Sequence, residues 1–554
     1  ESRNHMGTIA VVLSMLAAVV ASGIIVRAIP FAVPTPLVQI AFGAAIAASD
    51  LQHVELDPEI FFFLFLPPLL FLDGWRIPKE GLLHDKGMIL ELALGLVVVQ
   101  VVGMGLFIHW LIPAVPYPVA FALAAIVSPT DPIAVSSISA RFPIPKRVLH
   151  VLEGESLLND ASGLVCFRFA VAAAVSGTFS LLDASAVFVQ LVIVGVLAGV
   201  ALTLGVMSAK SWLTRHLGEE SGSQVLISLL VPFGAYELAE HLGGSGILSA
   251  VAAGITMSYV ELSGRALAGT RVQRTAVWDT VQFALNGIMF VLLGEQLPRI
   301  FAGAVDVVRE SNHENPAWLA VYVLAINLGL ALLRFLWVWV SLYIAYRLAK
   351  RRGDPAVHPP GLRLTAAMSV AGVRGAITLA GVLTLPLAVA DGTPFPARDL
   401  AIFLAAGVII LSLTAASFLL PRLLQGLHLP TESIEDEHTE LARAEASKAA
   451  IRAVEEAAHN MASRDSDVDL YAEAAARVMD MYRRRLEGQV GNENSVRIRR
   501  MNEIERQLRL AALNAERETL YALARANKIS DAKSRTLVRE IDLIEERLAK
   551  ARFI

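Results

Sequence analysis

The feature that most limits what this chain can fold into is a succession of long apolar segments between residues 7 and 424. Thirteen can be marked, at 7–29, 34–49, 58–75, 87–113, 117–140, 147–177, 183–207, 223–241, 245–260, 275–297, 317–348, 362–388 and 398–424. Segments of this length match the thickness of a lipid bilayer, and a soluble core explains neither their number nor their length. The sequence therefore predicts an all-α membrane protein with about thirteen transmembrane helices.

Charge divides the chain into two parts near residue 430. In residues 430–554, 46 of 125 positions are Lys, Arg, Asp or Glu, whereas the preceding 429 residues carry 52 such charges. Residues 430–554 are also rich in Ala, Glu, Arg and Leu at helical spacing. We therefore expect a transmembrane domain over residues 1–429 and an α-helical domain over 430–554. The second is either a regulatory domain with an unknown cytoplasmic ligand or partner, or a solvated tail.

Positive charge alternates between the loops that join the apolar segments. Seventeen Lys and Arg residues follow odd-numbered segments, and three follow even-numbered ones. Because Lys and Arg collect in cytoplasmic loops, the odd-numbered segments are predicted to end in the cytoplasm. The N-terminus is then outside and residues 430–554 are cytoplasmic. The sequence predicts a multi-pass protein of the inner (plasma) membrane, in contact with lipid and with no nucleic-acid partner.

The thirteen segments also divide into six, one and six, which allows an inverted repeat. The first repeat would span residues 7–177, a linker helix 183–207, and the second repeat 223–424. The fifth segment of each half is interrupted, by VSPTDPIAV (Val127–Val135) in the first and by AGVRGAITLAG (Ala371–Gly381) in the second. Matching interruptions of this kind indicate crossed discontinuous helices around a site near the middle of the membrane.

The sixth segment contains the polar stretch EGESLLND, residues 153–160. On a helix, Glu153, Ser156 and Asp160 share one face, and Glu155 and Asn159 lie on the adjacent one. Asp160 follows Arg147 by 13 residues, or roughly 20 Å of helix, which places it near the middle of the membrane. A carboxylate at that depth indicates a functional site, the alternative being a structural acid that bonds only to neighbouring helices.

The interruption in the fifth segment supplies a candidate partner for this stretch. Pro129 and Pro132 each remove a backbone donor and discourage helix on either side. Unwound backbone exposes carbonyl groups such as that of Thr130, which suit a hard cation, and Asp131 could neutralise the positive end of a half-helix. The alternative is a proline kink without a site, which is common in membrane helices.

Further charges lie inside the apolar segments and need partners. Arg374 lies in the middle of the twelfth segment, and we expect Glu155 to neutralise it, which would leave Asp160 free. Asp73 ends the third segment and is either an interfacial acid or part of the site. Arg334 and Glu237 are also intramembrane charges, for which the sequence indicates no partner.

Four motifs together resemble one family of transporters. FLPPLLFLDG, SPTDPIAV, EGESLLNDASGLV and GVRGAITLA occur in this order, in segments three, five, six and twelve. They are similar to those of the monovalent cation:proton antiporters related to the animal sodium/proton exchangers, over about residues 1–424. The resemblance implies a homodimer in which a core domain moves against a fixed dimer domain, in an elevator-like motion.

The resemblance also implies roles for individual residues. Asp160 would bind the cation and the proton in turn, with Asn159 as its neighbour in the Asn-Asp motif, and Ser156 and the Thr130 carbonyl as further Na⁺ ligands. Asp131 would lie at the helix crossing, and Glu155 and Arg374 would form a structural ion pair. At position 73 some relatives place a glutamate that helps bind the ion, and the resemblance implies the shorter Asp73 as a further candidate of the cation and proton site.

The sequence thus predicts a secondary antiporter that exchanges Na⁺, or Li⁺ or K⁺, for H⁺ and serves pH and cation homeostasis. A single buried carboxylate holds either a proton or a cation, and that competition is an exchange mechanism. We expect electroneutral exchange, no cofactor and no enzymatic activity. The alternatives are a K⁺/H⁺ antiporter, a passive cation channel, and a membrane aspartyl hydrolase using Asp131 and Asp160. Counterflow of protons distinguishes the antiporters from the others.

Overall fold

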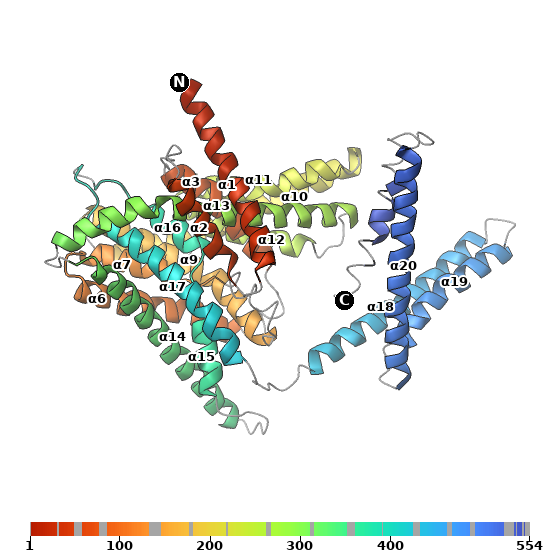
Figure 1. Ribbon diagram of the computed structural model, residues 1–554. Coiled ribbons are helices and arrows are strands. Elements are labelled where there is room, and N and C mark those ends of the chain that lie inside the picture. The colour runs from red at the N-terminus through yellow and green to blue at the C-terminus, as the bar shows by residue number, and fades with distance from the viewer. Residues whose placement is uncertain are drawn as a thin grey trace. The chain divides into compact units, whose positions relative to one another are not determined.

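A computed structural model describes most of the chain, and Figure 1 shows it as a ribbon. The described residues are 2–29, 33–48, 58–76, 86–131, 146–176, 181–217, 220–261, 268–310, 315–351, 361–389, 392–424, 433–462, 468–487, 493–525, 537–538, 540–545 and 548. The chain forms two compact units, Glu1–His428 and Leu429–Ile554. Each unit is described by itself.

The first unit, the membrane unit, is built from helices. They are α1 (Ser2–Ala28), α2 (Thr35–Ala47), α3 (Pro58–Arg76), α5 (Lys86–Leu90), the π-helix η1 (Glu91–Leu96), α6 (Val97–Leu111), α7 (Tyr117–Val127), α9 (Lys146–Ser176), α10 (Leu181–Leu217), α11 (Ser221–His241), α12 (Gly246–Glu261), α13 (Ala268–Glu310), α14 (Ala317–Arg351), α15 (Leu362–Val370), α16 (Ala376–Leu383) and α17 (Arg398–Leu424). Each of the thirteen predicted segments overlaps at least one of them, so the all-α prediction is confirmed.

Seven stretches of these helices are long and apolar enough to cross a membrane by length and composition. They are Glu91–Leu111, Gly154–Ser176, Val189–His216, Gly222–His241, Thr270–Val305, Ala317–Ile344 and Arg398–Leu424. Shorter apolar helices are Val12–Ala28, Thr35–Ala47, Tyr117–Val127 and Gly246–Glu261. The chain is therefore a multi-pass membrane protein, and thirteen crossings remain a prediction.

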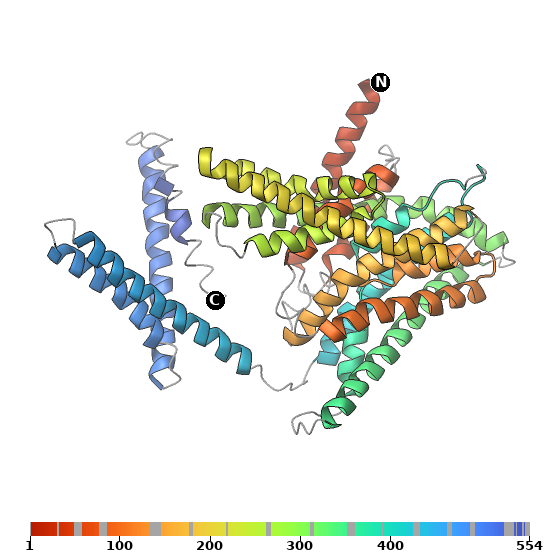
Figure 2. The same cartoon turned by 180° about the vertical axis from the view of Figure 1, so that it is seen from behind.

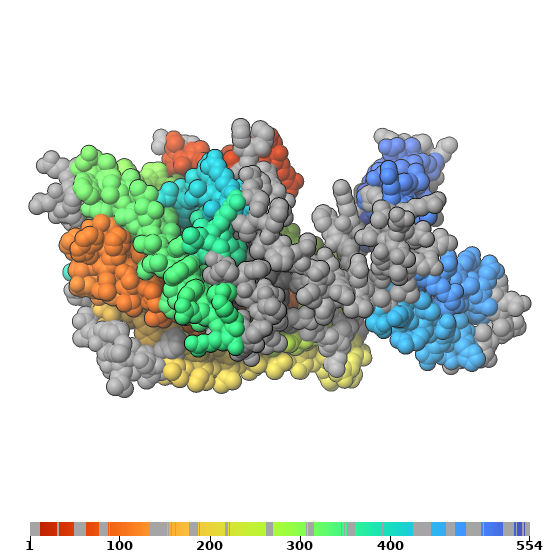
Figure 3. Space-filling view, turned by 90° about the horizontal axis from the view of Figure 1, so that it is seen from below, coloured from red at the N-terminus to blue at the C-terminus, as the bar shows by residue number. Residues whose placement is uncertain are grey.

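The outward faces of the helices fit a lipid environment. On α6, Val98, Val102 and Leu106 are exposed at a spacing of four residues. On α14, the exposed residues Leu328, Leu332 and Leu336 have the same spacing. Figure 3 shows α6 (orange) and α14 (green) on one surface of the unit. Aliphatic stripes of this kind would be costly in water and are favourable against lipid.

The membrane unit contains two sets of helices, which the two ribbon views place above and below one another (Figure 1, Figure 2). The scaffold set is α1–α3 and α10–α13, and its helices approach closely at glycines. A Cβ atom on Gly254 of α12 would lie 2.1 Å from the Phe71 carbonyl oxygen of α3, and one on Gly43 of α2 would lie 1.9 Å from the Val291 carbonyl oxygen of α13. The site set is α5–α7, η1, α9 and α14–α17.

Two of the helices in the site set are broken in the middle of the unit. The α7 helix ends at Val127, and the chain is non-helical from Ser128 to Asp131; residues 132–145, including Pro132, lie outside the described residues. In the other break, α15 ends at Val370 and α16 begins at Ala376. The breaks touch, because the Asp131 N–H donates to the Val373 carbonyl at 2.7 Å. The predicted interruption is thus confirmed between α15 and α16; in the first half the described residues show the end of α7, and the rest of the predicted interruption lies outside them.

The second unit contains α18 (Ser433–Ala462), α19 (Val468–Glu487) and α20 (Glu493–Arg525). The α18 and α19 helices pack against each other. On α20, Leu513 is buried, and Arg517 forms ion pairs with Asp542 and Glu545 from the chain that follows. Among the described residues of this unit, the buried hydrophobic ones are Ala475, Leu513, Val538 and Ile541, and charged side chains such as Glu473 and Arg477 are exposed.

Candidate functional site

The α9 helix carries four polar side chains into the middle of the site set. Glu155, Ser156, Asn159 and Asp160 are all buried, with 0 to 4% of each residue exposed. Steps of three and four residues place them on adjoining faces of one helix, as the sequence predicted. Helix α9 packs against the broken helix α7. There, Gly163 lets the Pro129 ring approach within 2.3 Å of the place where a Cβ would lie.

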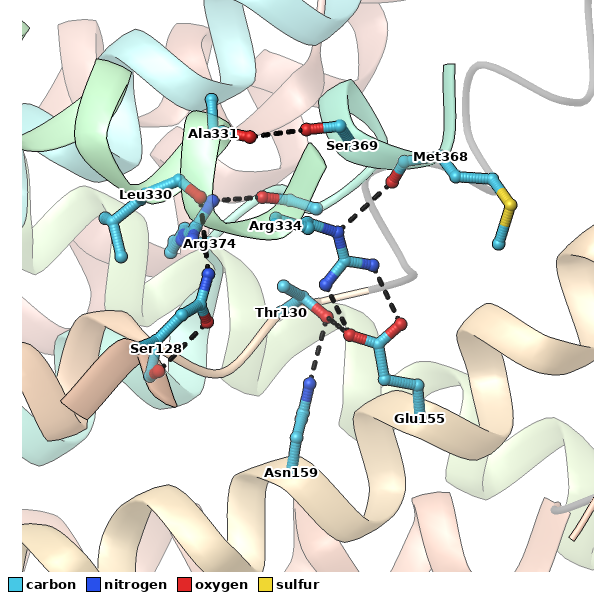
Figure 4. A network of polar contacts seen from close by, with 12 residues as sticks. Ser128, Thr130, Glu155, Asn159, Leu330, Ala331, Arg334, Met368, Ser369 and Arg374 are labelled. Atoms are coloured by element: carbon cyan, nitrogen blue, oxygen red, sulfur yellow. Dashed lines mark hydrogen bonds and ion pairs between the residues drawn. The ribbon is translucent and has the colours of Figure 1, made fainter. Parts of the chain in front are cut away.

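A buried ion pair joins α9 to α14. One guanidinium nitrogen of Arg334 donates to Glu155 Oε2 at 2.7 Å, and a second donates to Oε1 (Figure 4). Both side chains are 1% exposed. The Arg334 Nε also donates to the Met368 carbonyl of α15 at 3.2 Å. This bidentate geometry satisfies both carboxylate oxygens and fixes α9 against α14 and α15.

The partner of Glu155 corrects the sequence-based prediction, which paired Glu155 with Arg374. Arg374 donates instead to backbone carbonyls, from Nε to Val127 at 2.9 Å and from one terminal nitrogen to Gly372. Both carbonyls lie at C-terminal ends of broken helices, where a positive charge is favoured. Its second terminal nitrogen, Nη2, is buried and has no partner among the described atoms. Arg374 therefore compensates helix ends, and Arg334 is the residue that neutralises the acid.

A chain of hydrogen bonds connects this ion pair to the unwound part of α7. The Asn159 side-chain amide donates to Thr130 Oγ1 at 3.0 Å, and Thr130 Oγ1 donates to Glu155 Oε1 at 3.4 Å (Figure 4). The bond fixes the orientation of the Asn159 amide. As a result Asn159 Oδ1 is buried without a partner among the described residues. A buried acceptor with no donor is costly unless something else, such as a cation or water, supplies the missing contact.

Asp160 differs from Glu155 in having no neutralising partner. Within the part of the chain that the structure describes, no side chain donates a hydrogen bond or forms an ion pair with its carboxylate. The prediction that one acid of the stretch is paired and Asp160 is left unpaired therefore agrees with the described contacts. Only the identity of the arginine differs.

Asp131 lies at the crossing of the two breaks. Its backbone N–H bonds to Val373, and its carboxylate lies against Gly375, where a Cβ would be 1.7 Å from Oδ2. Gly375 is the residue before α16, so the carboxylate lies at the positive end of that helix. Glycine is required at position 375, because any side chain would displace the acid.

Asp73 lies in the last turn of α3, which the scaffold set holds in place. Arg76, one turn further on, donates to Gln282 of α13 at 2.8 Å and pairs with Asp279. Trp75 donates from Nε1 to Glu261 of α12 at 2.7 Å. Asp73 itself is partly buried. The interfacial interpretation thus fits Trp75 and Arg76, and a role of Asp73 in the site stays a prediction.

Sequence reasoning missed two residues of this network. Gln100 of α6 and Ser128 at the end of α7 are buried and hydrogen-bonded to each other at 3.0 Å. The signal for Gln100 is a single amide in the apolar run VVVQVVGMG. The role of Arg334 is also absent from the sequence-based predictions, although its charge stands out in the apolar helix α14. Spacing along the chain gives no means of choosing its partner.

Chemically, the site combines neutral oxygen atoms with one carboxylate that has no partner among the described residues. Besides the buried Asn159 Oδ1, the Thr130 carbonyl receives no hydrogen bond from any described residue. Oxygen ligands of this kind suit a hard monovalent or divalent cation or a proton, and do not suit a soft metal. Ser156 Oγ, on the same face as Asp160, is a further oxygen within this region.

Comparison with known proteins identifies the family. The family described as "Sodium/hydrogen exchanger, transmembrane" matches residues 14–426. The "Uncharacterized Na(+)/H(+) exchanger YjcE" of Escherichia coli K12 is 40% identical over 540 residues, covering 96% of this chain and 97% of that protein. The "Sodium, potassium, lithium and rubidium/H(+) antiporter" of Bacillus pumilus is 44% identical over 415 residues, covering 74% of this chain and 60% of that protein.

A solved structure shares the fold of the membrane unit. The sodium proton antiporter MjNhaP1 from Methanocaldococcus jannaschii superposes with a TM-score of 0.56 at 17% sequence identity. The match covers 76% of this chain and 99% of that protein. At this level of identity the similarity establishes the fold alone.

Proposed function

The chain belongs to the sodium/hydrogen exchanger family, and from this premise we propose that it exchanges Na⁺ for H⁺ across the plasma membrane through Asp160. The observation that carries the proposal is the buried carboxylate of Asp160 on α9, which packs against α7; no described residue forms a hydrogen bond or an ion pair with this carboxylate. Such a group needs either a proton or a cation to be neutral in this environment. Because one site holds one or the other, binding on one side and release on the other exchanges the two ions.

The neighbouring oxygens complete the proposed cation site. We assign Ser156, the Thr130 carbonyl and Asn159 as ligands or near neighbours of Na⁺, with Asp160 as the charged ligand and Asp73 as a second acid. Asp131 offsets the end of α16, and the Glu155–Arg334 pair holds the α9 stretch in place. The relative from Bacillus pumilus is named for sodium, potassium, lithium and rubidium, so Li⁺ and K⁺ are candidate substrates too.

The test is a proteoliposome assay with a pH-sensitive dye. Addition of Na⁺, Li⁺ or K⁺ to one side should drive protons from the opposite side toward the side of addition, and the Asp160→Asn variant should lose this exchange while inserting normally. The amide of asparagine cannot cycle a proton. Substantial dye-reported exchange by Asp160→Asn would remove Asp160 from its central role. Cation conductance at fixed pH without proton movement would indicate a channel.

We further propose electroneutral exchange, with one cation for each proton. Glu155 is paired with Arg334, Asp131 lies at a helix end, and Asn159 is neutral where a second aspartate would add a proton carrier. Asp160 is then the one group that must change its protonation in each cycle. With the membrane potential clamped, an imposed voltage should not drive cation accumulation. If it does, Asp73, the second acid of the proposed site, is the first candidate for a second proton carrier.

We propose the transport motion and the oligomeric state by analogy with the family. Alternating access would move the site set against the scaffold set in an elevator-like manner, within a homodimer, and the exchanger would serve pH and cation homeostasis. The packing supports the proposed inverted repeat. The second helix of the first half (α2) packs on the third helix of the second half (α13). The third helix of the first half (α3) packs on the second helix of the second half (α12), as an inverted repeat requires.

The C-terminal unit is proposed to be cytoplasmic and regulatory, with the N-terminus of the chain outside. The positive loops support this orientation, and the unit's exposed charged helices support a location in water. Removal of residues 430–554 should leave a transporter with altered activity or pH set point, as measured in the same dye assay. Complete loss of transport in a truncated protein that inserts normally would make the unit part of the transport mechanism itself.

A further inference from the structure

Gln100 is a fully buried amide in an otherwise apolar stretch of α6. Its residue is 0% exposed, and its neighbours in the run VVVQVVGMG are apolar. A carboxamide in such surroundings costs free energy unless both its nitrogen and its oxygen are hydrogen-bonded. In Gln100 both atoms have a partner. The Nε2 donates to the Leu330 carbonyl of α14 at 3.3 Å, and Oε1 accepts from Ser128 Oγ at 3.0 Å.

These two bonds connect the start of the unwound segment to α14. Ser128 is the residue that follows α7, and it is itself buried. Leu330 lies one turn before Arg334, which holds Glu155. The next carbonyl on α14, that of Ala331, accepts from Ser369 Oγ of α15 at 2.8 Å (Figure 4). Two adjacent carbonyls of α14 therefore hold the two segments: that of Ala331 bonds to α15 directly, and that of Leu330 is connected to the end of α7 through Gln100.

The connection matters because Thr130 lies two residues after Ser128. The Thr130 side chain is already held by Asn159 and Glu155, and its carbonyl receives no hydrogen bond from a described residue. With Ser128 fixed at one end and the Thr130 side chain at the other, the intervening backbone has little freedom. A carbonyl ligand fixed in this way is organised before the ion arrives, which raises affinity and favours ions of one radius.

We propose that Gln100 is a positioning residue for the cation site, holding the Ser128–Thr130 segment so that the Thr130 carbonyl is available beside Asp160. Gln100 does not itself contact the ion. It sets the apparent affinity for monovalent cations and the discrimination among them, through the position of the segment. This inference rests on the proposed exchange function.

The test compares Gln100→Met and Ser128→Ala with the parent in the dye assay. Gln100→Met keeps the length of the side chain and removes both hydrogen bonds. Loss of a buried hydrogen bond is worth up to about a tenfold change in an equilibrium constant, so KM for Na⁺ should rise by up to about tenfold with kcat nearly unchanged. The KM values for Na⁺, Li⁺ and K⁺ should also become more alike. Ser128→Ala should act in the same direction.

The double variant makes the test specific to the shared bond. If Gln100 acts through Ser128, the two substitutions remove the same bond. The fold-increase in KM of the double variant Gln100→Met with Ser128→Ala should then be clearly smaller than the product of the fold-increases of the two single variants. Asn327→Leu is the matched control: this amide on α14 donates to the Val408 carbonyl at 3.2 Å and is partly buried. It should lower the melting temperature without changing KM or the cation ratios.

Two results would overturn the proposal while leaving the exchange function intact. One is unchanged KM and cation ratios in a folded Gln100→Met protein, and the other is single effects on KM that simply multiply. If Gln100→Met does not fold, the smaller Ser128→Ala change decides, and unchanged KM values in that variant would count against the proposal. Absence of cation-driven proton movement in the parent protein would instead contradict the exchange function.

Discussion

The two sets of helices in the membrane unit hold together by different means. In the scaffold set, backbones touch directly at glycines, as where Gly254 meets Phe71 and Gly43 meets Val291. In the site set, buried side chains of α6, α9 and α14 bond to one another and to the broken helices. Direct backbone packing leaves no room for an ion. A polar network can leave selected oxygen atoms unpaired, and Asp160, which has no partner among the described residues, lies on the same helix as Glu155 and Asn159 of this network.

Each set of helices needs its own kind of residue. Close approach of two helices requires glycine or another small residue, whatever the chemistry of the surroundings. A buried network requires that nearly every donor and acceptor be satisfied, and the exceptions carry the function. Substitutions should therefore damage the scaffold set through volume and the site set through lost partners.

The largest effect is expected from filling a glycine contact in the scaffold set. Gly254→Leu would force α12 away from α3, because its Cβ alone would lie 2.1 Å from a backbone oxygen that cannot move aside. We expect no folded protein, as judged by size-exclusion chromatography and thermal melting in detergent. Gly205→Leu on α10 is the matched control, since nothing lies within 4 Å of its Cβ position. Equal behaviour of the two variants would contradict the scaffold description.

The next effect is expected from breaking the ion pair of the site set. Arg334→Ala would leave Glu155 buried and unpaired, at a cost of about 3–5 kcal/mol of unfolding free energy. Arg374→Ala should cost less, because Arg374 bonds to backbone carbonyls and not to an acid. Thermal melting measures both. Exchanging the charges, Glu155→Arg with Arg334→Glu, should recover part of the loss. If exchanging the charges of Glu155 and Arg374 recovers stability instead, Glu155 pairs with Arg374, as predicted from the sequence.

A moderate effect is expected from Thr130, which connects the network to the unwound segment. Thr130→Val keeps the shape of the side chain and removes the hydroxyl, leaving the Asn159 amide without its acceptor. The expected cost is about 1–3 kcal/mol, accompanied by a higher KM for Na⁺. Thr130→Ser retains the hydroxyl and should remain close to the parent. If the serine and valine variants behave alike, the hydroxyl does not hold the segment.

The smallest effect on stability is expected where the two sets meet at a partly exposed ion pair. Arg168 of α9 donates to Glu240 of α11 at 2.9 Å and to the Tyr236 hydroxyl at 3.2 Å. Both charged side chains are about one-third exposed, so Glu240→Gln should cost less than about 1 kcal/mol. If the sets move against each other, this pair must break, and turnover in the dye assay should change. A larger loss of stability would show that the pair is structural.

Several features of this protein follow from local patterns in its sequence. The apolar segments, the change of character near residue 430 and the two breaks are each specified by short stretches of the chain. Hydropathy and helix-breaking residues act within a few turns of the chain, so their consequences can be predicted locally. The polar stretch at residues 153–160 is recognisable as a site for the same reason, since an acid in the middle of a membrane segment is costly wherever it lies.

Partner choice was decided only by the tertiary structure. Glu155 could have met Arg334 or Arg374, both of which lie in apolar segments far away in sequence, and it bonds to Arg334, whose guanidinium on α14 reaches both carboxylate oxygens. Gln100 likewise gained its role from the positions of Ser128 and Leu330. The free energy of a buried polar contact depends on distances between helices, and spacing along one chain does not contain those distances. The sequence alone therefore predicted that a charge in this site must be neutralised, and the packing of the helices selected the residue that does so.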